Sequence, residues 1–236
     1  MSTSPDTIFA EETLADAPVR HERRKDARPG ELLDAALDLF VEKGYAATRV
    51  EEVAKRAGVS KGTLFLYFPS KEDLFKAVVR KNISGRFAEW DQEIDEFAGS
   101  SREMLHFCLH SWWDRIGATK ASGIPKLMMS EGHNFPELAS FYQHEVMRPG
   151  SALIERVLRR GIDRGEFRPM DLQYGVLMVL APLLFLAMSK HSLGTCCDML
   201  AQLDPSQFLA AQYDVLISGF ALAGAPNLSG METGDI

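Results

Sequence analysis

Hydroxyl, ammonium and side-chain-free positions follow one another within one short segment of this sequence. Ser60, Lys61, Gly62 and Thr63 are consecutive, and Tyr67 stands about one helical turn after Thr63. Hydroxyl and ammonium groups bind phosphate oxygens, and a glycine lets a second molecule approach the backbone closely. The chemistry that this set favours is contact with the phosphates and base edges of a nucleic acid.

Signals for helix starts and ends surround this segment. We expect Thr48 to cap a short helix, with Glu51 at the capping-box position. Gly58 can end that helix in the left-handed conformation, and Ser60 is expected to cap the next one. Ser70 then starts a third helix. The pattern predicts two short helices joined by a tight turn, which is the layout of a helix-turn-helix.

A supporting helix is predicted from Pro29 to Lys43. Its apolar residues recur at helical spacing, a proline stands in its first turn and Gly44 follows its end. Short capped helices joined through a glycine also occur in all-helical proteins that bind no DNA. The turn, its spacing and the flanking helix together favour the DNA-binding interpretation.

Residues from about 29 to 79 resemble the DNA-binding domain of the TetR family of bacterial transcriptional regulators. The run from Ala57 to Phe75, AGVSKGTLFLYFPSKEDLF, carries most of the resemblance. Two residues depart from the family pattern: Phe65 lacks a phosphate-binding hydroxyl, and Leu66 is expected to touch a thymine methyl or the sugar backbone. The resemblance implies DNA contacts at Thr48, Ser60, Lys61, Gly62, Thr63, Tyr67 and Lys71.

Charge is distributed unevenly along the chain. The 236 residues carry a formal net charge of −7, which argues against a nonspecific nucleic-acid binder. From Arg20 to Lys81, however, fourteen Lys and Arg stand against ten Asp and Glu. We expect Arg24 and Arg28, in a basic arm before the first helix, to contact DNA as homeodomain arms do. A solvated leader with a chance run of charge is the alternative.

Nothing in the sequence alternates like a strand, so an all-α fold is predicted. An N-terminal three-helix helix-turn-helix domain is followed by a C-terminal helical ligand-binding and dimerisation domain, with about nine helices in total. The expected divisions are a disordered acidic tail (1–19), the basic arm and DNA-binding domain (20–80), the helical domain (81–225) and a flexible tail (226–236).

Two of the predicted helices are long. One should run from Lys71 to about Phe97, because no proline interrupts it, although Gly85 is a weak point. The other should run from Pro136 to Arg164 and bend near Met147, because the following Pro149 cannot continue the hydrogen-bond ladder.

The segment from Val176 to Met188 is apolar on every face of a helix. It is shorter than the roughly twenty residues that cross a bilayer, so we expect a buried helix and no membrane contact. TetR-like proteins pair their last two long helices in a dimer, and the resemblance implies a homodimer here. The expected interface residues are Val176, Leu180, Leu183, Phe208, Val215 and Phe220.

Aromatic, sulfur-containing and weakly polar side chains of the C-terminal domain suit a small hydrophobic or amphipathic effector. The segment 126–149 is similar, more loosely, to the ligand domain of TetR members related to efflux-pump regulators. Each candidate is also a plausible ordinary core residue. The candidates are Trp90, Phe107, His110, Trp113, Met128, Met129, Phe141 and Met178.

Two further groups suggest other chemistry. Glu103, His106 and His110 share one face of a predicted helix, but one helix supplies only half of a bundle metal site and Glu103 also fits a capping box. No metal and no cofactor are therefore predicted. Cys196 and Cys197 are adjacent and allow a redox-sensing alternative. An odd total of three cysteines and the lack of an export signal favour reduced, cytoplasmic thiols.

Three classes of function compete. The leading hypothesis is a cytoplasmic repressor that binds a palindromic operator in double-stranded DNA as a homodimer and is released by the effector. The second is a DNA-binding regulator without a small-molecule inducer, either constitutive or redox-responsive. The third is an enzyme in the helical bundle, which is disfavoured because the sequence contains no nucleophile elbow, phosphate loop, dinucleotide fingerprint or zinc-protease motif.

Overall fold

A computed structural model describes residues 29–192 and 198–220. Within these two ranges the chain forms helices and no β-strand, which confirms the predicted all-α fold. Several predictions concern residues outside them: the acidic tail, the basic arm with Arg24 and Arg28, the pair Cys196 and Cys197, and the C-terminal tail.

The described residues form twelve α-helices, where the sequence predicts about nine. Two predicted helices are each broken in two, and the sequence does not predict the short α11, which accounts for the difference. The helices are α1 (Pro29–Lys43), α2 (Val50–Arg56), α3 (Lys61–Tyr67), α4 (Lys71–Asn82), α5 (Phe87–Asp95), α6 (Ser101–Trp112), α7 (Gly123–Glu131), α8 (Pro136–Tyr142), α9 (Arg148–Asp163), α10 (Leu172–Lys190), α11 (Asp198–Ala201) and α12 (Pro205–Phe220).

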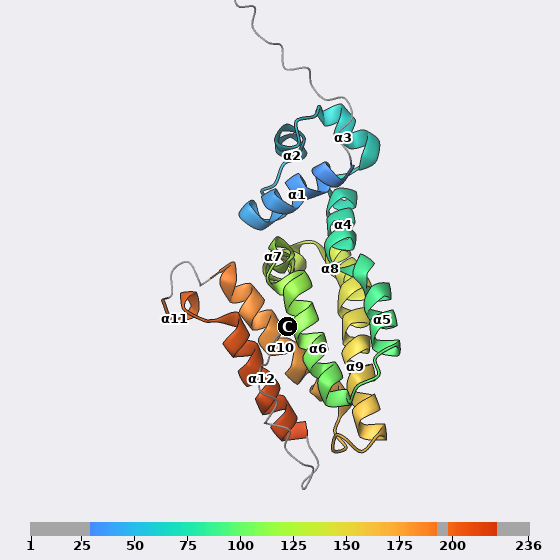
Figure 1. Ribbon diagram of the computed structural model, residues 1–236. Helices are drawn as coiled ribbons and strands as arrows, with labels where there is room; N and C mark the ends of the chain where they lie inside the picture. Colours follow the sequence, from blue (N-terminus) through green and yellow to red (C-terminus); the bar gives the residue numbers. More distant parts are fainter. Residues whose placement is uncertain (1–28, 193–197, 221–236) are drawn as a thin grey trace, which may run out of the picture.

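The helices are arranged in two units stacked end to end (Figure 1). The smaller unit contains α1, α2 and α3, and α4 leads from it into the larger unit. There α6, α9, α10 and α12 lie roughly along the long axis of the molecule, with α7 directly beneath α1. The predicted order of a small three-helix unit followed by a larger helical unit is therefore observed.

Apolar side chains at helical spacing hold the smaller unit together. Leu32 of α1, Leu64 of α3 and Phe75 of α4 are completely buried. The Phe40 and Phe75 rings meet edge to face with their centroids 5.3 Å apart, a favourable aromatic geometry. Because α3 places Leu64 in this core, its opposite face is directed outward.

The predicted helix from Lys71 to Phe97 is wrong, because it breaks after Asn82. Ile83 leaves the helical conformation (φ −131°, ψ −75°), and a short 3-10 turn leads into α5. A Cβ atom at Gly85 would lie 2.6 Å from the carbonyl oxygen of Arg80, so this tight turn depends on a glycine. Beyond the break, α5 packs against α9.

The helix predicted from Pro136 to Arg164 changes its hydrogen-bond pattern near Met147. A five-residue π-helical segment, Gln143–Met147, separates α8 from α9. Pro149 lies in the first turn of α9, where its missing N–H leaves a gap in the hydrogen-bond ladder that the wider segment accommodates. At its other end α9 is followed by Gly165, which has the left-handed φ of 69° typical of a helix end.

The helix α10 is longer than the apolar segment from Val176 to Met188. Its 19 residues make it long and apolar enough to cross a membrane by length and composition, so the expectation of a segment too short to do so is wrong. In the fold, however, Val179, Leu183 and Ala187 on its inner face are at most 1% exposed. The helix also packs against α7, α9 and α12. One face of α10 is therefore buried in the core of this chain.

Candidate functional site

The turn between α2 and α3 has the predicted chemistry. Gly58 adopts a left-handed φ of 73° after α2. The Ser60 side-chain oxygen accepts the backbone N–H of Thr63 at 3.0 Å, and the two hydroxyl oxygens lie 2.9 Å apart. Ser60 is therefore the N-cap of α3, as the sequence predicts. Ser70 caps α4 in the same way, by accepting the N–H of Asp73.

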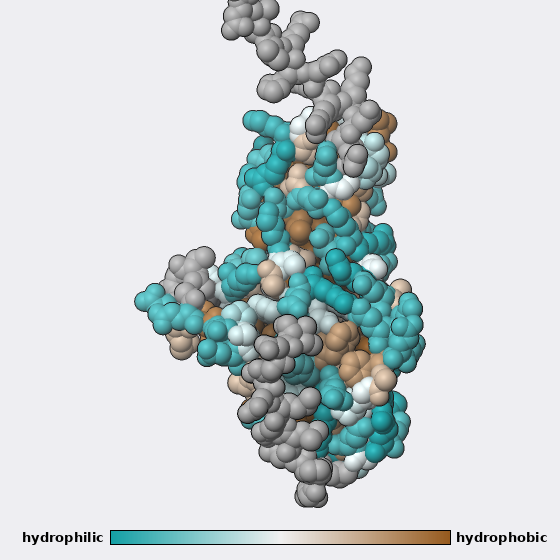
Figure 2. Space-filling view, in the orientation of Figure 1, coloured by the Kyte–Doolittle hydropathy of each residue, from teal (hydrophilic) through white to brown (hydrophobic). Residues whose placement is uncertain are grey.

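The outward face of α3 carries the exposed candidates for DNA contact. Leu66 is 84% exposed and Tyr67 is 43% exposed. The space-filling view shows apolar colour at the outer edge of the smaller unit, near α3, on an otherwise mainly hydrophilic surface (Figure 2). Exposed apolar side chains of this size at the end of a small unit indicate a contact surface.

Lys61 is exposed on the same helix and is already paired with a carboxylate. Its Nζ lies 2.6 Å from Oε1 of Glu51 and 5.6 Å from the centre of the Phe65 ring. The hydrogen bond from Lys61 lowers the pKa of the Glu51 carboxyl. An exposed ion pair of this kind adds little to stability, so Lys61 can exchange the carboxylate for a phosphate at small cost.

The predicted capping role of Thr48 is wrong. Arg49 occupies the N-cap position of α2, and its side chain makes no capping hydrogen bond. Thr48 is 2% exposed, and its hydroxyl donates to the backbone carbonyl oxygens of Gly44 (2.6 Å) and Leu39 (3.1 Å). The hydroxyl thus binds within the turn between α1 and α2 and is not presented to a phosphate.

Lys71 likewise points inward, although the resemblance implies a phosphate contact. Its Nζ donates to the carbonyl oxygens of Tyr45 (2.8 Å), Ala46 (3.3 Å) and Thr48 (3.1 Å). The ammonium also lies 4.4 Å from the centre of the Tyr45 ring. Burial lowers the pKa of this ammonium. Lys71 therefore braces the turn between α1 and α2 from the first residue of α4.

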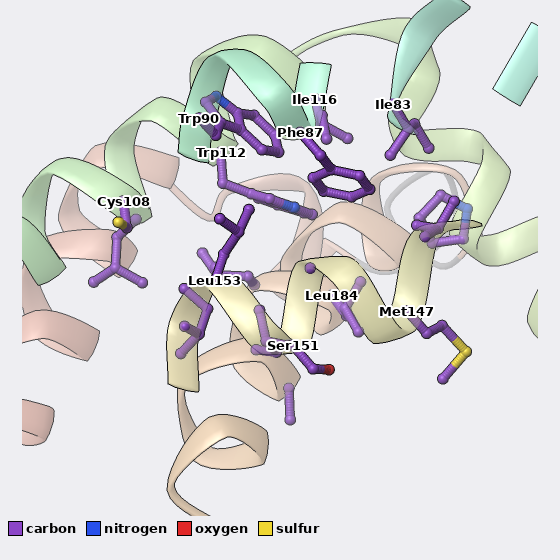
Figure 3. A pocket seen from close by; sticks show the side chains of 18 of the residues that line it. Ile83, Phe87, Trp90, Cys108, Trp112, Ile116, Met147, Ser151, Leu153 and Leu184 are labelled. Atoms are coloured by element: carbon purple, nitrogen blue, oxygen red, sulfur yellow. The ribbon is translucent and has the colours of Figure 1, made fainter. Parts of the chain in front are cut away.

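The larger unit contains a cavity of about 570 Å³, within the usual range for small-molecule sites. Residues from Ile83, which directly follows α4, to α10 form its wall, and nearly all of them are apolar. In the close-up, aromatic rings form one side of the cavity and aliphatic side chains with one hydroxyl form the other (Figure 3). The first side includes Trp90, Trp112 and Phe87, and the second includes Leu153, Leu184 and Ser151.

Half of the predicted effector contacts line this cavity, namely Trp90, Phe107, Met128 and Met129. The other four lie elsewhere. His110 stacks on a second histidine of α6, Trp113 packs over Gly117, Phe141 lies beneath basic side chains of α4, and Met178 is 55% exposed on α10. None of these four side chains belongs to the cavity wall.

Three cavity residues are direct sequence neighbours of predicted effector contacts. Trp112, Tyr142 and Leu177 line the cavity, where Trp113, Phe141 and Met178 were expected. An apolar helix with aromatic residues at consecutive positions does not reveal which of them faces a given neighbour. The direction is set by packing. Both Trp112 and Tyr142 directly precede π-helical turns, which rotate the next residues about the helix axis.

A few polar groups interrupt the apolar wall. Trp112, Tyr142 and Ser151 each carry one hydrogen-bond donor, and none of these donors has a partner among the residues that the structure describes. The Trp112 ring nitrogen lies near the centre of the close-up (Figure 3). The cavity therefore suits an apolar molecule with one or two hydrogen-bond acceptors.

Cys108 also lines the cavity and is a free thiol. Burial raises its pKa to about 12, so the thiol stays protonated near neutral pH. A reactive cysteine needs the thiolate, and Cys108 therefore does not support the redox alternative.

The Glu103, His106 and His110 group has a structural role. Glu103 completes the capping box of α6 with Ser100. The two histidine rings stack with centroids 4.2 Å apart, and His106 meets Tyr213 edge to face. Among the described residues, no group of three potential metal ligands is present.

The predicted dimer residues are divided between the core and the surface. Val176, Leu183 and Phe220 are at most 8% exposed within the single chain, so these three side chains lie in its core. Leu180 is half-buried and lines the cavity. Phe208 is partly buried, and Val215 is 71% exposed. When every face of a helix is apolar, the sequence does not indicate which face is buried and which is exposed.

The outer face of α10 is apolar and exposed. Its residues recur at intervals of three and four, so they form one stripe along the helix. Tyr174, Met178 and Phe185 are 61%, 55% and 51% exposed. Leu177 and Ala181 of the same stripe also line the cavity, which places the stripe beside one edge of the cavity wall.

Two family models match this chain. Residues 32–78 match the model of bacterial regulatory proteins, tetR family. Residues 98–193 match the model of a Tetracyclin repressor-like C-terminal domain. The first match covers most of α1 to α4, and the second contains the whole cavity wall from α6 to α10.

Two bacterial regulators are similar in sequence. The HTH-type transcriptional regulator RutR of Escherichia coli (strain K12) is 47% identical over 167 residues, which are 69% of this chain and 74% of RutR. The fatty acid metabolism regulator protein of Bacillus subtilis (strain 168) is 27% identical over 146 residues, which are 61% of this chain and 74% of that protein.

Solved structures of FadR proteins share the fold. FadR from Bacillus subtilis, in complex with stearoyl-CoA, has a TM-score of 0.67 at 21% identity, and FadR from Bacillus halodurans has 0.68 at 24%. Each comparison covers 81% of this chain and 99% of the other. These relatives are transcriptional regulators, so the prediction that the chain is not an enzyme is confirmed. The chain belongs to the TetR family of bacterial transcriptional regulators.

Proposed function

We propose that this protein is a cytoplasmic repressor that binds a palindromic operator as a homodimer and is released by an apolar effector. The cavity of about 570 Å³ is the observation that carries this proposal. Protein interiors are normally packed to near-crystalline density, so an apolar space of this size is an unusual feature of a domain that only dimerises. It favours the ligand-responsive hypothesis over a regulator without an inducer.

The DNA contact is assigned to α3 and its cap. Lys61 and Tyr67 are exposed there, and the hydroxyls of Ser60 and Thr63 lie at the start of the helix. The inward direction of Thr48 and Lys71 reduces the set of side chains expected to touch DNA. Leu66, as the most exposed large apolar residue of the helix, is placed to contact a thymine methyl group.

The stripe on α10 is assigned to a second copy of the chain. Large exposed apolar stripes are costly in water, and two-fold symmetry lets one such stripe cover its counterpart. Val215, on the neighbouring helix α12, is also exposed and apolar. A homodimer presents two copies of α3, as the two halves of a palindromic site require.

The effector is assigned to the class of long acyl compounds with a carbonyl or carboxyl acceptor. The wall is apolar over most of its area, and its unpartnered donors on Trp112, Tyr142 and Ser151 match an acceptor group. A structural relative was solved with stearoyl-CoA, which belongs to this class. An effector that couples to DNA binding by 1–3 kcal/mol would lower operator affinity by about 5–150-fold.

A DNA-binding measurement tests the assignment of α3. The full-length protein first selects a duplex from a random-sequence library, and its affinity for that duplex is followed by fluorescence anisotropy. We expect the double variant Lys61→Ala, Tyr67→Ala to bind the duplex at least about tenfold more weakly, because each substitution removes a contact with the DNA phosphate backbone. Arg159→Ala is the matched control, because it removes another exposed cation paired with a glutamate, on α9. Equal affinity of the double variant and the wild type would refute the assignment.

The same assay tests the effector, with stearoyl-CoA as the probe. Release of the duplex by about 5–150-fold supports the proposal. If stearoyl-CoA, free fatty acids and other apolar compounds leave the affinity unchanged, the regulator without an inducer becomes the better hypothesis.

Light scattering tests the dimer. We expect Met178→Asp combined with Val215→Asp to convert the dimer to a monomer at micromolar concentration. Leu66→Asp introduces the same charge at another exposed apolar position and should leave the dimer intact. A wild-type monomer would contradict the assignment of the stripe.

A further inference from the structure

Glu131, the last residue of α7, reaches from the larger unit into the smaller one. Its Oε1 accepts the backbone N–H of Tyr45 at 3.0 Å, and its Oε2 accepts that of Ala46 at 2.8 Å. These two residues form part of the turn between α1 and α2. Hydrogen bonds to a carboxylate are about twice as strong as neutral ones, so this contact fixes the turn firmly.

The turn is shaped to receive this carboxylate. Gly44 has a left-handed φ of 85°, and a Cβ atom there would lie 2.2 Å from Oε1 of Glu131. The N–H groups of the turn point to Glu131, whereas its carbonyl oxygens accept from Lys71. The Tyr45 ring meets Phe135, which directly precedes α8, with centroids 4.7 Å apart. The larger unit thus holds both the backbone and the side chain of this turn.

The same helix, α7, forms part of the cavity wall. Met128 and Met129 line the cavity, and Met128 is about one helical turn before Glu131. At the start of α7, a Cβ atom at Gly123 would lie 2.6 Å from the Val41 side chain, so the helix also packs closely on α1. A molecule in the cavity therefore contacts, through Met128, the helix whose last residue holds the turn.

Other contacts between the units are of a different kind. Arg80 of α4 donates to both carboxylate oxygens of Glu145 (3.0 and 2.7 Å), and Lys120 pairs with Asp38 at 2.6 Å. Both are pairs of exposed side chains, which water and salt replace at low cost. Only a bond to the backbone dictates the conformation of the turn itself, which distinguishes Glu131 from these pairs.

We infer that Glu131 is the positioning residue through which occupancy of the cavity reaches the helix-turn-helix. In the empty protein Glu131 holds the turn that precedes α2, and thereby sets the direction of α2 and α3. An occupant that displaces α7 withdraws this carboxylate and changes that direction. The inference rests on the proposed release by an effector and names the contact that regulates it.

The experiment compares Glu131→Gln and Glu131→Ala with Glu145→Gln, which removes the charge of another contact between the units. Stearoyl-CoA binding is followed by the fluorescence of Trp90 and Trp112, and DNA affinity by anisotropy with the selected duplex. We expect the Glu131 variants to bind stearoyl-CoA within about twofold of the wild type. The ratio of DNA affinities without and with stearoyl-CoA should fall at least fivefold in Glu131→Ala, and less in Glu131→Gln, which keeps one acceptor. Glu145→Gln should keep the wild-type ratio.

Hydrogen exchange gives a readout that needs no effector. Glu131→Ala should speed the exchange of the Tyr45 and Ala46 amides and of residues 50–67, and should weaken DNA binding at least threefold. If stearoyl-CoA does not change the DNA affinity of the wild type, the proposed effector is wrong. The amide exchange rates and the DNA affinity of Glu131→Ala then test the role of Glu131 without an effector. The inference would be overturned if Glu131→Ala changed neither the amide exchange rates nor the DNA affinity. It would also be overturned if only Glu145→Gln lowered the ratio of DNA affinities without and with stearoyl-CoA.

Discussion

The smaller unit buries its central apolar side chains completely, whereas the larger unit leaves about 570 Å³ between its own. Leu32, Leu64 and Phe75 illustrate the first case, and Trp112 and Phe87 the second. Close packing gives a surface of fixed shape, which a DNA reader needs. An unfilled apolar space forgoes contacts and thus some stability, but it can accept a ligand. The two units therefore differ in rigidity and in adaptability.

The largest expected effect separates these two kinds of packing. Leu64→Ala should lower the free energy of unfolding by about 2–5 kcal/mol, because a fully packed site cannot collapse around the lost atoms. Leu153→Ala should cost less than about 2 kcal/mol, because this side chain already borders the cavity and loses fewer contacts. Urea denaturation measures both, and Leu66→Ala, at an exposed site, should stay within about 0.5 kcal/mol.

Equal costs for the two core leucines would break the comparison. They would mean that the cavity closes in solution and that the larger unit is as densely packed as the smaller one.

A smaller effect should appear at the two glycines that flank α2. Gly58→Ala forces an alanine into the left-handed conformation at an open position, at a cost of about 1–2 kcal/mol. Gly44→Ala incurs the same cost and also collides with the Glu131 carboxylate. We therefore expect at least about 1 kcal/mol more destabilisation at Gly44 in thermal unfolding. Similar values for both variants would show that Glu131 moves away freely, so that the units are less firmly joined at this turn.

The smallest expected effect is a pH dependence within the larger unit. Nε2 of His191 lies 2.7 Å from the hydroxyl oxygen of Ser122, which is fully buried. Burial, followed by the charges of Lys190 and Lys126, lowers the pKa of His191 below the usual value near 6.5. Between the two pKa values the unfolded chain binds more protons, so this stability is present above pH 6.5 and is lost as the pH falls towards the lower folded pKa.

Thermal melts at pH 7.5 and 5.5 measure that loss. His191→Gln should reduce the difference between the two pH values, whereas His133→Gln, at an exposed histidine outside this contact, should retain it. A difference that His191→Gln leaves unchanged would assign the pH dependence to other groups.

Predictability from sequence also differs between the units. The caps at Ser60 and Ser70 and the turn at Gly58 depend on residues only a few positions apart, and the structure confirms them. The inward direction of Thr48 and Lys71 depends on carbonyl groups from other segments, so it was not predictable. In the larger unit the aromatic pattern does not distinguish Trp112 and Tyr142, which line the cavity, from their neighbours Trp113 and Phe141, which do not.

The sequence by itself determined the helical fold, the helix-turn-helix and the family, because caps, glycine turns and apolar periodicity are local properties of the chain. Only the tertiary structure decided which face of each apolar helix is buried, which residues enclose the cavity and which carboxylate holds the turn before α2. These properties depend on how helices rotate about their axes and break, as at Gly85 and Met147, when distant segments compete for the same space.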